Sequence, residues 1–193
     1  MNRLILASSS TARLSLLKNM GFVFDVCASN IKEFRKENES ATSYVQRLAA
    51  EKADFVFTKL GESDDLVVLA ADTVVCCDNE VLEKPQDKND FIRMMRLLSN
   101  NTHNVFTGFC VLSNKAKFVE LVTSSVVFCA LTDQQIDAYW ATGEPVNKAG
   151  GYGIQGVAGG FIKSIQGSYS SIVGLPLVEV REALSKQGVA CAF

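Results

Sequence analysis

An apolar run in the middle of the chain ends on a carboxylate. Residues 66–71 read Leu-Val-Val-Leu-Ala-Ala, and Asp72, Thr73 and the apolar residues 74–77 follow them. A short run rich in Val and Leu between polar segments is typical of a strand that is buried on both faces. Asp72 then either lies at the carboxyl edge of a strand, where open α/β sheets bind ligands, or caps a turn. Because an unpaired buried carboxylate costs several kcal/mol, the first interpretation requires a metal or a cationic group as its partner.

The spacing of apolar residues predicts a mixed order of strands and helices along the rest of the chain. Ser10 and either Ser40 or Thr42 are suitable N-caps, and Asp78-Asn79 is a suitable hairpin turn. The predicted strands are 3–7, 22–27, 66–77, 81–82, 105–112 and 118–131, and helices are predicted to begin near 10, 40, 91, 132 and 175. This order predicts an α/β fold with one extended, partly antiparallel sheet flanked by helices.

Four basic residues lie in or beside the predicted loops and helix starts: Arg13, Lys52, Lys84 and Lys148. Lys52 falls on the apolar face of the long helix, where it either snorkels out of the core or points at an anion in a cleft. The turn Ser8–Ser10 before a helix is either an ordinary cap or a seat for a phosphate. Free backbone N–H groups and the helix dipole would favour an anion there.

Residues 148–156 are dense in glycine and contain a G-x-G-x-x-G pattern at Gly151, Gly153 and Gly156. A dinucleotide fingerprint would follow a strand and open a helix, and this segment has neither neighbour. We expect the glycines to let the backbone approach a ligand closely, and Gln155 to face a flat polar base. A merely flexible loop is the alternative.

Further polar candidates are few. Glu33, Glu37 and Glu83 lie outside the central strand, and one of them could join Asp72 in binding a hard cation. Mg²⁺ prefers a couple of carboxylates together with substrate phosphates, and spacing does not select among the three glutamates. The single histidine, His103, falls in a predicted polar turn, so neither a His-rich zinc site nor a Ser-His-Asp triad is expected.

Composition narrows the class of protein. A chain of 193 residues with 48% hydrophobic residues is long enough for one large domain or two small lobes. Its formal net charge of −2 argues against a surface for duplex nucleic acid. The six cysteines lack Cys-x-x-Cys spacing and lie mostly in apolar stretches, which is typical of reduced thiols in the cytosol. Because neither a signal peptide nor a membrane span is visible, we expect a cytoplasmic protein with no membrane partner.

Several segments, taken in order, resemble the Maf family of nucleoside triphosphate pyrophosphatases, once called septum formation inhibitors. Each segment is weakly specific alone, but together they cover nearly the whole chain. They are Leu4-Ile5-Leu6-Ala7-Ser8-Ser9-Ser10 with Arg13 and Leu16-Leu17, Ala50-Glu51-Lys52-Ala53, Ala71-Asp72-Thr73-Val74-Val75, Glu83-Lys84-Pro85, Thr107-Gly108, residues 148–156, Gly167-Ser168-Tyr169 and residues 173–177.

The resemblance implies one Maf/ITPase-like domain over residues 1–193, with two lobes around a nucleotide-binding cleft. A nucleoside triphosphate would be cut there between its α- and β-phosphates, giving the monophosphate and pyrophosphate. A divalent cation, Mg²⁺ or Mn²⁺, would be required, with Glu33 and Asp72 as its ligands. Asp72 is also implied as the proton acceptor that activates water. Homodimers are a further expectation from the family.

The resemblance also implies which residues bind the substrate. The base-selecting positions are matched by Thr73 and Gln155, and the segment 151–156 looks like the subgroup that acts on dTTP and UTP. The residues implied in substrate binding are Ser8, Ser10, Arg13, Lys52, Lys84 and Lys148.

One position departs from the pattern of this subgroup. Ala12 replaces an arginine that the subgroup uses in base selection, and Thr11 replaces a proline. A lost charged hydrogen bond is worth about 1.5–3 kcal/mol, roughly ten- to a hundred-fold in binding. One alternative is therefore a pyrophosphatase for 7-methylguanosine triphosphate or another modified base. A separate alternative, independent of Ala12, is a non-catalytic nucleotide-binding regulator of cell division.

Overall fold

The computed structural model describes residues 2–61 and 63–191, and the chain divides into two compact units. Unit 1 comprises Met1–Asp72, Thr107–Val122 and Gly174–Phe193, and unit 2 comprises Thr73–Phe106 and Thr123–Val173. Three long strands contribute residues to both units: β3 (Leu66–Cys77), β5 (Thr102–Ser113) and β6 (Lys117–Phe128).

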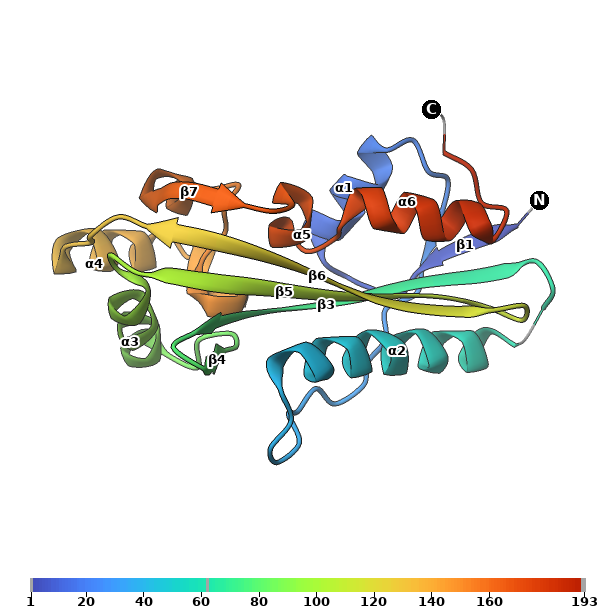
Figure 1. The fold of residues 1–193 in the computed structure, drawn as a ribbon, viewed down its shortest axis with the longest axis horizontal. Coiled ribbons are helices and arrows are strands. Elements are labelled where there is room, and N and C mark those ends of the chain that lie inside the picture. The colour runs from blue at the N-terminus through green and yellow to red at the C-terminus, as the bar shows by residue number, and fades with distance from the viewer. Residues whose placement is uncertain (1, 62, 192–193) are drawn as a thin grey trace. The chain divides into compact units, whose positions relative to one another are not determined.

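Among the described residues the strands form a seven-stranded mixed sheet (Figure 1). The remaining strands are β1 (Arg3–Leu6), β2 (Asp25–Val26), β4 (Glu80–Leu82) and β7 (Ile162–Gln166), and the order is β2-β1-β3-β5-β6-β7 with β4 beside β3. β1 pairs parallel with β2 and β3, whereas β3–β4 and β6–β7 are antiparallel. The predicted α/β class with a mixed, helix-flanked sheet is therefore confirmed.

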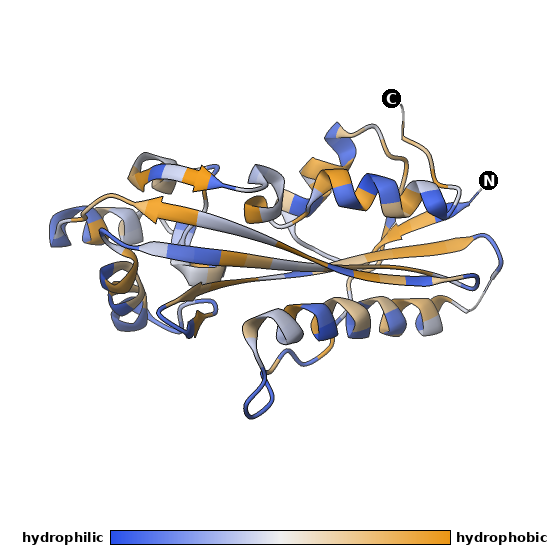
Figure 2. Cartoon of the chain, in the orientation of Figure 1, coloured by the Kyte–Doolittle hydropathy of each residue, from blue (hydrophilic) through white to orange (hydrophobic). Residues whose placement is uncertain are grey.

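Unit 1 packs helices on both faces of its strands. In Figure 1, α2 (Ala41–Leu60) lies on one side of these strands, and α1 (Thr11–Asn19) and α6 (Leu177–Lys186) lie on the other. The segment of β3 in unit 1 is strongly hydrophobic, as Figure 2 shows, because it is covered on both sides. α2 approaches β5 closely at Gly108, where an added Cβ would lie 2.6 Å from the Val45 carbonyl oxygen.

The caps of the unit 1 helices follow the sequence. Ser10 caps α1 by accepting a hydrogen bond from the backbone N–H of Arg13, and Ser40 caps α2 by accepting one from Ser43. The predicted helix starts at Ser10 and Ser40 are therefore confirmed. Thr42, the alternative start, lies inside the first turn of α2.

Unit 2 is built around an aromatic core. Its helices are α3 (Lys88–Leu98), α4 (Asp133–Ala141) and α5 (Tyr169–Val173), and its 3₁₀ turns are η1 (Glu144–Asn147), η2 (Ala149–Gly151) and η3 (Val157–Phe161). Thr132 and Gln135 form a capping box at the start of α4. The rings of Phe91, Phe128 and Tyr139 are fully buried in the core that these elements share.

Three local predictions are resolved by the structure. The turn at Asp78-Asn79 is confirmed, since both residues have the positive φ that a two-residue hairpin requires. The strand predicted at 22–27 shrinks to Asp25–Val26, because only these residues pair with β1. The polar turn predicted around His103 is wrong: this residue lies in β5 and is 1% exposed.

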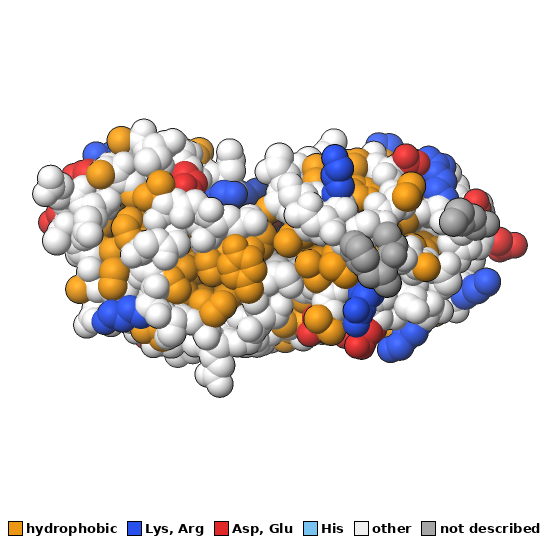
Figure 3. Space-filling view, turned by 90° about the horizontal axis from the view of Figure 1, so that it is seen from above, with side chains coloured by type: hydrophobic (Ala, Val, Ile, Leu, Met, Phe, Trp, Pro, Cys, Tyr) orange, Lys and Arg blue, Asp and Glu red, His pale blue; other side chains and the backbone are white. Residues whose placement is uncertain are grey.

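The face in Figure 3 carries charged side chains of both signs among hydrophobic and polar ones. Large hydrophobic side chains that remain exposed include Val26 and Val178 in unit 1 and Val157 and Ile165 in unit 2. Within the described residues, no helix is both long enough and apolar enough to cross a bilayer.

Candidate functional site

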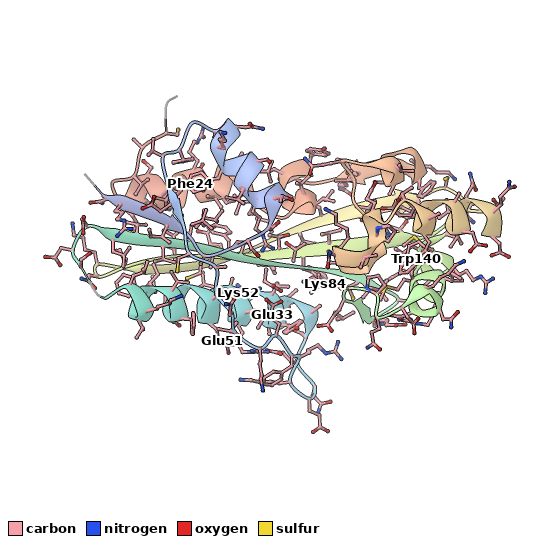
Figure 4. The ribbon with its side chains drawn as sticks, turned by 180° about the vertical axis from the view of Figure 1, so that it is seen from behind. Phe24, Glu33, Glu51, Lys52, Lys84 and Trp140 are labelled. Carbon is pink, nitrogen blue, oxygen red and sulfur yellow. The ribbon has the colours of Figure 1, made fainter. Side chains whose placement is uncertain are left out.

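An ion cluster lies in unit 1, around Asp72 in the middle of β3. Because β3 continues to Cys77, Asp72 neither ends a strand nor caps a turn, and both sequence-based interpretations of its position are wrong. Lys52 extends from α2, and its Nζ donates to Asp72 Oδ1 at 2.7 Å. The same Nζ lies 2.8 Å from Glu33 Oε1, and Figure 4 shows Lys52 and Glu33 side by side. Lys52 and Asp72 are each 6% exposed. The two carboxylates therefore share one ammonium group.

The structure decides between the two interpretations of Lys52. Its neighbours on α2, Ala49, Ala53 and Val56, are fully buried, and Lys52 is buried with them rather than extended to solvent. Snorkelling is therefore excluded. Lys52 points at an anion, and the anion in this structure is the carboxylate of Asp72.

The start of α1 adds a second cation to unit 1. Arg13 Nε donates to the Gly174 carbonyl oxygen at 2.8 Å, and its Nη1 lies 3.4 Å from Ser8 Oγ. Ser8 Oγ also accepts a hydrogen bond from the backbone N–H of Ser10 at 3.2 Å. Ala12 lies half-buried in the same first helical turn. The predicted residues Ser8, Ser10 and Arg13 are thus brought together.

Burial shifts the pKa values of Asp72 and Arg13. Removal from water raises the pKa of Asp72 above its ordinary value, while Lys52 and Arg13 act in the opposite direction and Glu33 raises it further. Burial also lowers the pKa of Arg13, and the nearby carboxylates of Asp72 and Glu33 oppose that shift. Lys52 and Asp72 are the buried pair of this cluster, and their contact offsets much of the cost of burying each, whereas Glu33 reaches Lys52 from an exposed position.

The remaining predicted residues lie in unit 2. Lys84 follows β4 and is exposed, Lys148 is half-buried at the end of η1, and Thr73 is half-buried on β3. The backbone N–H of Gly150 donates to the Glu83 carbonyl oxygen at 2.9 Å, so the segments that carry Lys84 and Lys148 lie side by side.

The comparisons with known proteins assign the chain to a family. A family model described as "Maf-like protein" matches residues 3–187. The chain belongs to the Maf-like family. The resemblance inferred from the motifs is therefore confirmed over nearly the whole chain.

Curated relatives of this Maf-like chain cover it almost end to end. Proteins named dTTP/UTP pyrophosphatase are 45% identical in Vibrio vulnificus strain YJ016 (95% of this chain, 98% of the relative) and 43% identical in Hahella chejuensis (97% and 93%). The protein of that name in Salmonella typhimurium is 47% identical (96% and 93%). Among solved structures, the Staphylococcus aureus Ham1 protein has 14% identity and a TM-score of 0.46, covering 66% of this chain and 72% of its own.

The donor set in unit 1 suits a hard divalent cation. No group of three or more His, Cys, Asp or Glu residues with metal-binding geometry occurs in the part of the chain that the structure describes. Glu33 and Asp72 nevertheless present two carboxylates to the same ammonium group. Two carboxylates completed by water and phosphate oxygens are the set that Mg²⁺ prefers, so these residues fit such an ion. Of the three glutamates that spacing left open, Glu33 contacts the ammonium group that also binds Asp72.

The loop that carries Glu33 is fastened to α2 by a residue that the sequence analysis missed. Arg47 donates to Glu39 through Nε and Nη2 at 2.6 and 2.7 Å, and through Nη2 to the Phe34 carbonyl oxygen at 2.9 Å. Its Nη1 also contacts Glu51 at 3.0 Å. The hydrogen bonds from Arg47 to Glu39 lower the pKa of Glu39 to about 2. The sequence does show opposite charges four positions apart at Arg47 and Glu51, a spacing that predicts an ion pair on one face of a helix.

The glycine-rich segment packs against the protein itself. An added Cβ at Gly150 would lie 2.8 Å from the Val75 side chain, and one at Gly151 would lie 3.0 Å from the ring of Phe91. At Gly156 it would overlap the carboxylate of Glu144. These glycines therefore allow close packing within unit 2. The expected close approach of their backbone to a ligand, and the alternative of a merely flexible loop, stay predictions.

Proposed function

We propose that this member of the Maf-like family hydrolyses nucleoside triphosphates, dTTP and UTP first, to the monophosphate and pyrophosphate. The observation that carries the proposal is the buried Asp72, paired with Lys52 beside Arg13 in a chain with 43–47% identity to proteins named dTTP/UTP pyrophosphatase. A buried carboxylate surrounded by cations is the combination that water activation next to a polyphosphate requires.

In this proposal Asp72 is the general base. Burial raises the pKa of Asp72 above its ordinary value, which makes the carboxylate a stronger proton acceptor. The substrate's α-phosphate is attacked by water whose proton passes to Asp72 Oδ, and pyrophosphate is the leaving group. Proton acceptance by a positioned carboxylate contributes about 10²–10⁴-fold to the rate.

The cationic residues bind the phosphates. A triphosphate carries about four negative charges, and phosphoryl transfer is accelerated mainly by positioning and by electrostatic stabilisation of these charges. Charged hydrogen bonds from guanidinium and ammonium groups supply both effects. Ser8, Ser10, Arg13 and Lys52 are the proposed phosphate contacts within unit 1, and Lys84 and Lys148 are the predicted phosphate contacts within unit 2.

Glu33 and Asp72 are the proposed ligands of a divalent cation, Mg²⁺ or Mn²⁺. When bound, such an ion neutralises phosphate charge and orients the oxygens of the substrate. Lys52 then serves to hold the two carboxylates in place, since its Nζ contacts both of them.

Base choice depends on a different set of residues. Gln155 and Thr73 are the proposed base-selecting positions, and the relatives' names favour thymine and uracil. Ala12 favours a second candidate, because it leaves no guanidinium in the first turn of α1 at that position. That candidate is the same reaction on 7-methylguanosine triphosphate or another modified base.

The test is pyrophosphate release by the purified protein with Mg²⁺ across dTTP, UTP, CTP, 7-methylguanosine triphosphate and ITP. Asp72→Asn is measured in parallel, with Asp54→Asn as the control, because Asp54 is an exposed carboxylate on α2. We expect turnover of dTTP and UTP that falls at least 10²-fold in Asp72→Asn and is unchanged in the control. Retained turnover in Asp72→Asn contradicts its role. Binding without turnover of any nucleotide supports the non-catalytic regulator instead.

The predicted nucleotide cleft, the homodimer and the cytoplasmic location stay predictions. The homodimer is checked by sedimentation at the concentration used for the assay. A single monomeric species would contradict it without affecting the proposed reaction.

A further inference from the structure

A tight turn in unit 2 carries Gln155. The backbone N–H of Gly156 donates to the carbonyl oxygen of Gly153 at 3.1 Å, so Ile154 and Gln155 are the two central residues of a four-residue turn. Gln155 is exposed at this turn. The backbone on either side therefore sets the position from which its side chain extends.

Both ends of the turn are held by a tyrosine and a glutamate from outside it. The backbone N–H of Gly153 donates to Tyr139 Oη at 3.2 Å, and that of Val157 donates to Glu144 Oε2 at 3.0 Å. Tyr139 Oη in turn donates to Glu144 Oε1 at 2.8 Å. The Glu144 carboxylate therefore holds two backbone N–H groups: that of Val157 directly, and that of Gly153 through the hydroxyl of Tyr139.

The two supporting residues are themselves well fixed. Tyr139 lies on α4 and is 1% exposed, with its ring packed edge-on against Phe161 at 5.4 Å between centroids. Burial raises the pKa of Tyr139, so it remains a hydroxyl donor near neutral pH. Glu144 begins η1 directly before Pro145, which restricts the backbone there. Gly156 has no Cβ because one would overlap the carboxylate of Glu144.

We propose that Glu144, acting through Tyr139 and the backbone of residues 153–157, is a specificity-positioning residue that fixes where Gln155 meets the base. The inference rests on the proposed function, since it assumes that Gln155 contacts the base of a nucleoside triphosphate. Glu144 accepts hydrogen bonds from Tyr139 Oη and from the backbone N–H of Val157, and through these it holds the turn that carries Gln155.

The experiment measures selectivity rather than activity alone. Glu144→Gln replaces one acceptor oxygen by an amide NH₂, and Tyr139→Phe removes the hydroxyl while keeping the ring. The assay gives kcat/KM for dTTP and for CTP on the same enzyme sample. Because both substrates meet the same enzyme, any loss of folded protein cancels from their ratio. We expect the ratio of kcat/KM for dTTP to that for CTP to fall about tenfold in each variant, the effect of losing roughly one hydrogen bond.

Two controls separate positioning from general damage. Asp137→Asn makes the same change of charge at an exposed carboxylate on α4, and it should leave the ratio unchanged. Gln155→Ala should lower the ratio by itself, and adding Glu144→Gln to it should lower the ratio no further, because the two residues act on one contact.

The possible outcomes are distinct. An unchanged ratio in both Glu144→Gln and Tyr139→Phe overturns the inference while leaving the proposed function intact. Independent, additive losses in the double variant with Gln155→Ala also overturn it. Wild-type protein that cleaves neither nucleotide overturns the proposed function and this inference with it.

Discussion

Replacing Lys52 by methionine tests whether the ion pair of Lys52 and Asp72 is as buried as the structure indicates. Met has nearly the volume of the lysine stem, so packing on α2 is preserved and the ammonium alone is lost. Asp72, 6% exposed, then loses the partner that lies 2.7 Å from its Oδ1. Removing one partner of a buried ion pair costs about 3–5 kcal/mol. Because Arg13 remains nearby, we expect the lower end, about 3 kcal/mol in the free energy of unfolding near pH 8.

The loss should depend on pH in a defined direction. Without Lys52, burial holds the pKa of Asp72 above its unfolded value, so the folded variant takes up a proton more readily than the unfolded chain. Stability from such a raised pKa is lost as pH rises through the folded value and regained as pH falls. The difference between wild type and Lys52→Met should therefore shrink on going from pH 8 to pH 5.

The assay is urea unfolding followed by far-ultraviolet circular dichroism at both pH values. Lys117→Met is the matched control, since Lys117 forms an exposed ion pair with Asp54 and should cost under about 1 kcal/mol. The double variant Lys52→Met with Asp72→Asn should recover part of the loss, because no unpaired charge remains buried. Equal costs for Lys52→Met and Lys117→Met, or a cost that grows toward pH 5, would refute the reasoning.

Two further predictions concern positions outside the ion cluster. Burial lowers the pKa of His103 to about 4, and protonation would make both ring nitrogens donors although Nδ1 has no hydrogen-bond partner among the described residues. Because the unfolded chain binds this proton near pH 6.5, folding stability should decline by about 3 kcal/mol from pH 6.5 to pH 4. Melting temperatures across this range should show a shallower decline in His103→Gln, and an identical decline would contradict the assignment. Gly108→Ala should destabilise by about 1–3 kcal/mol, because its Cβ would meet the Val45 carbonyl at 2.6 Å. The melting temperature of Gly160→Ala, where the Cβ meets nothing within 4 Å, is the comparison, and equal shifts would count against the close approach.

The elements that the sequence predicted correctly are those with local causes. The β3 strand follows from two apolar runs on either side of Asp72 and Thr73, and the starts of α1 and α2 follow from Ser10 and Ser40, whose side chains cap within three residues. The strand expected at 22–27 was mostly wrong, because only the pairing of Asp25 and Val26 with β1 defines it. Pairing depends on a distant partner, and periodicity does not report it.

The sequence was sufficient to predict which residues belong to the candidate site, but not which of them contact one another. Lys52 and Asp72 were both identified, but their 2.7 Å contact depends on which face of α2 meets the sheet, and spacing left that open. His103 looked polar from its neighbours in sequence, whereas its ring packs 5.0 Å from Phe128 in the core of unit 2. Glu144 gave no signal in the sequence, because its hydrogen bonds are to residues up to thirteen positions away and depend on how the chain folds.

The buried pair of Lys52 and Asp72 is not explained by stability. Well-packed apolar residues of similar volume are as stabilising as a buried ion pair, or more so. The surrounding segments are apolar enough to have accepted them, since residues 66–71 and the facing positions of α2 are fully buried. Two charges at the centre of such a surface break the local pattern of the sequence, and such departures are expected where function requires them. The same burial that makes the pair costly also raises the pKa of Asp72. The cost in stability and the basicity that the proposed reaction needs therefore have one physical origin.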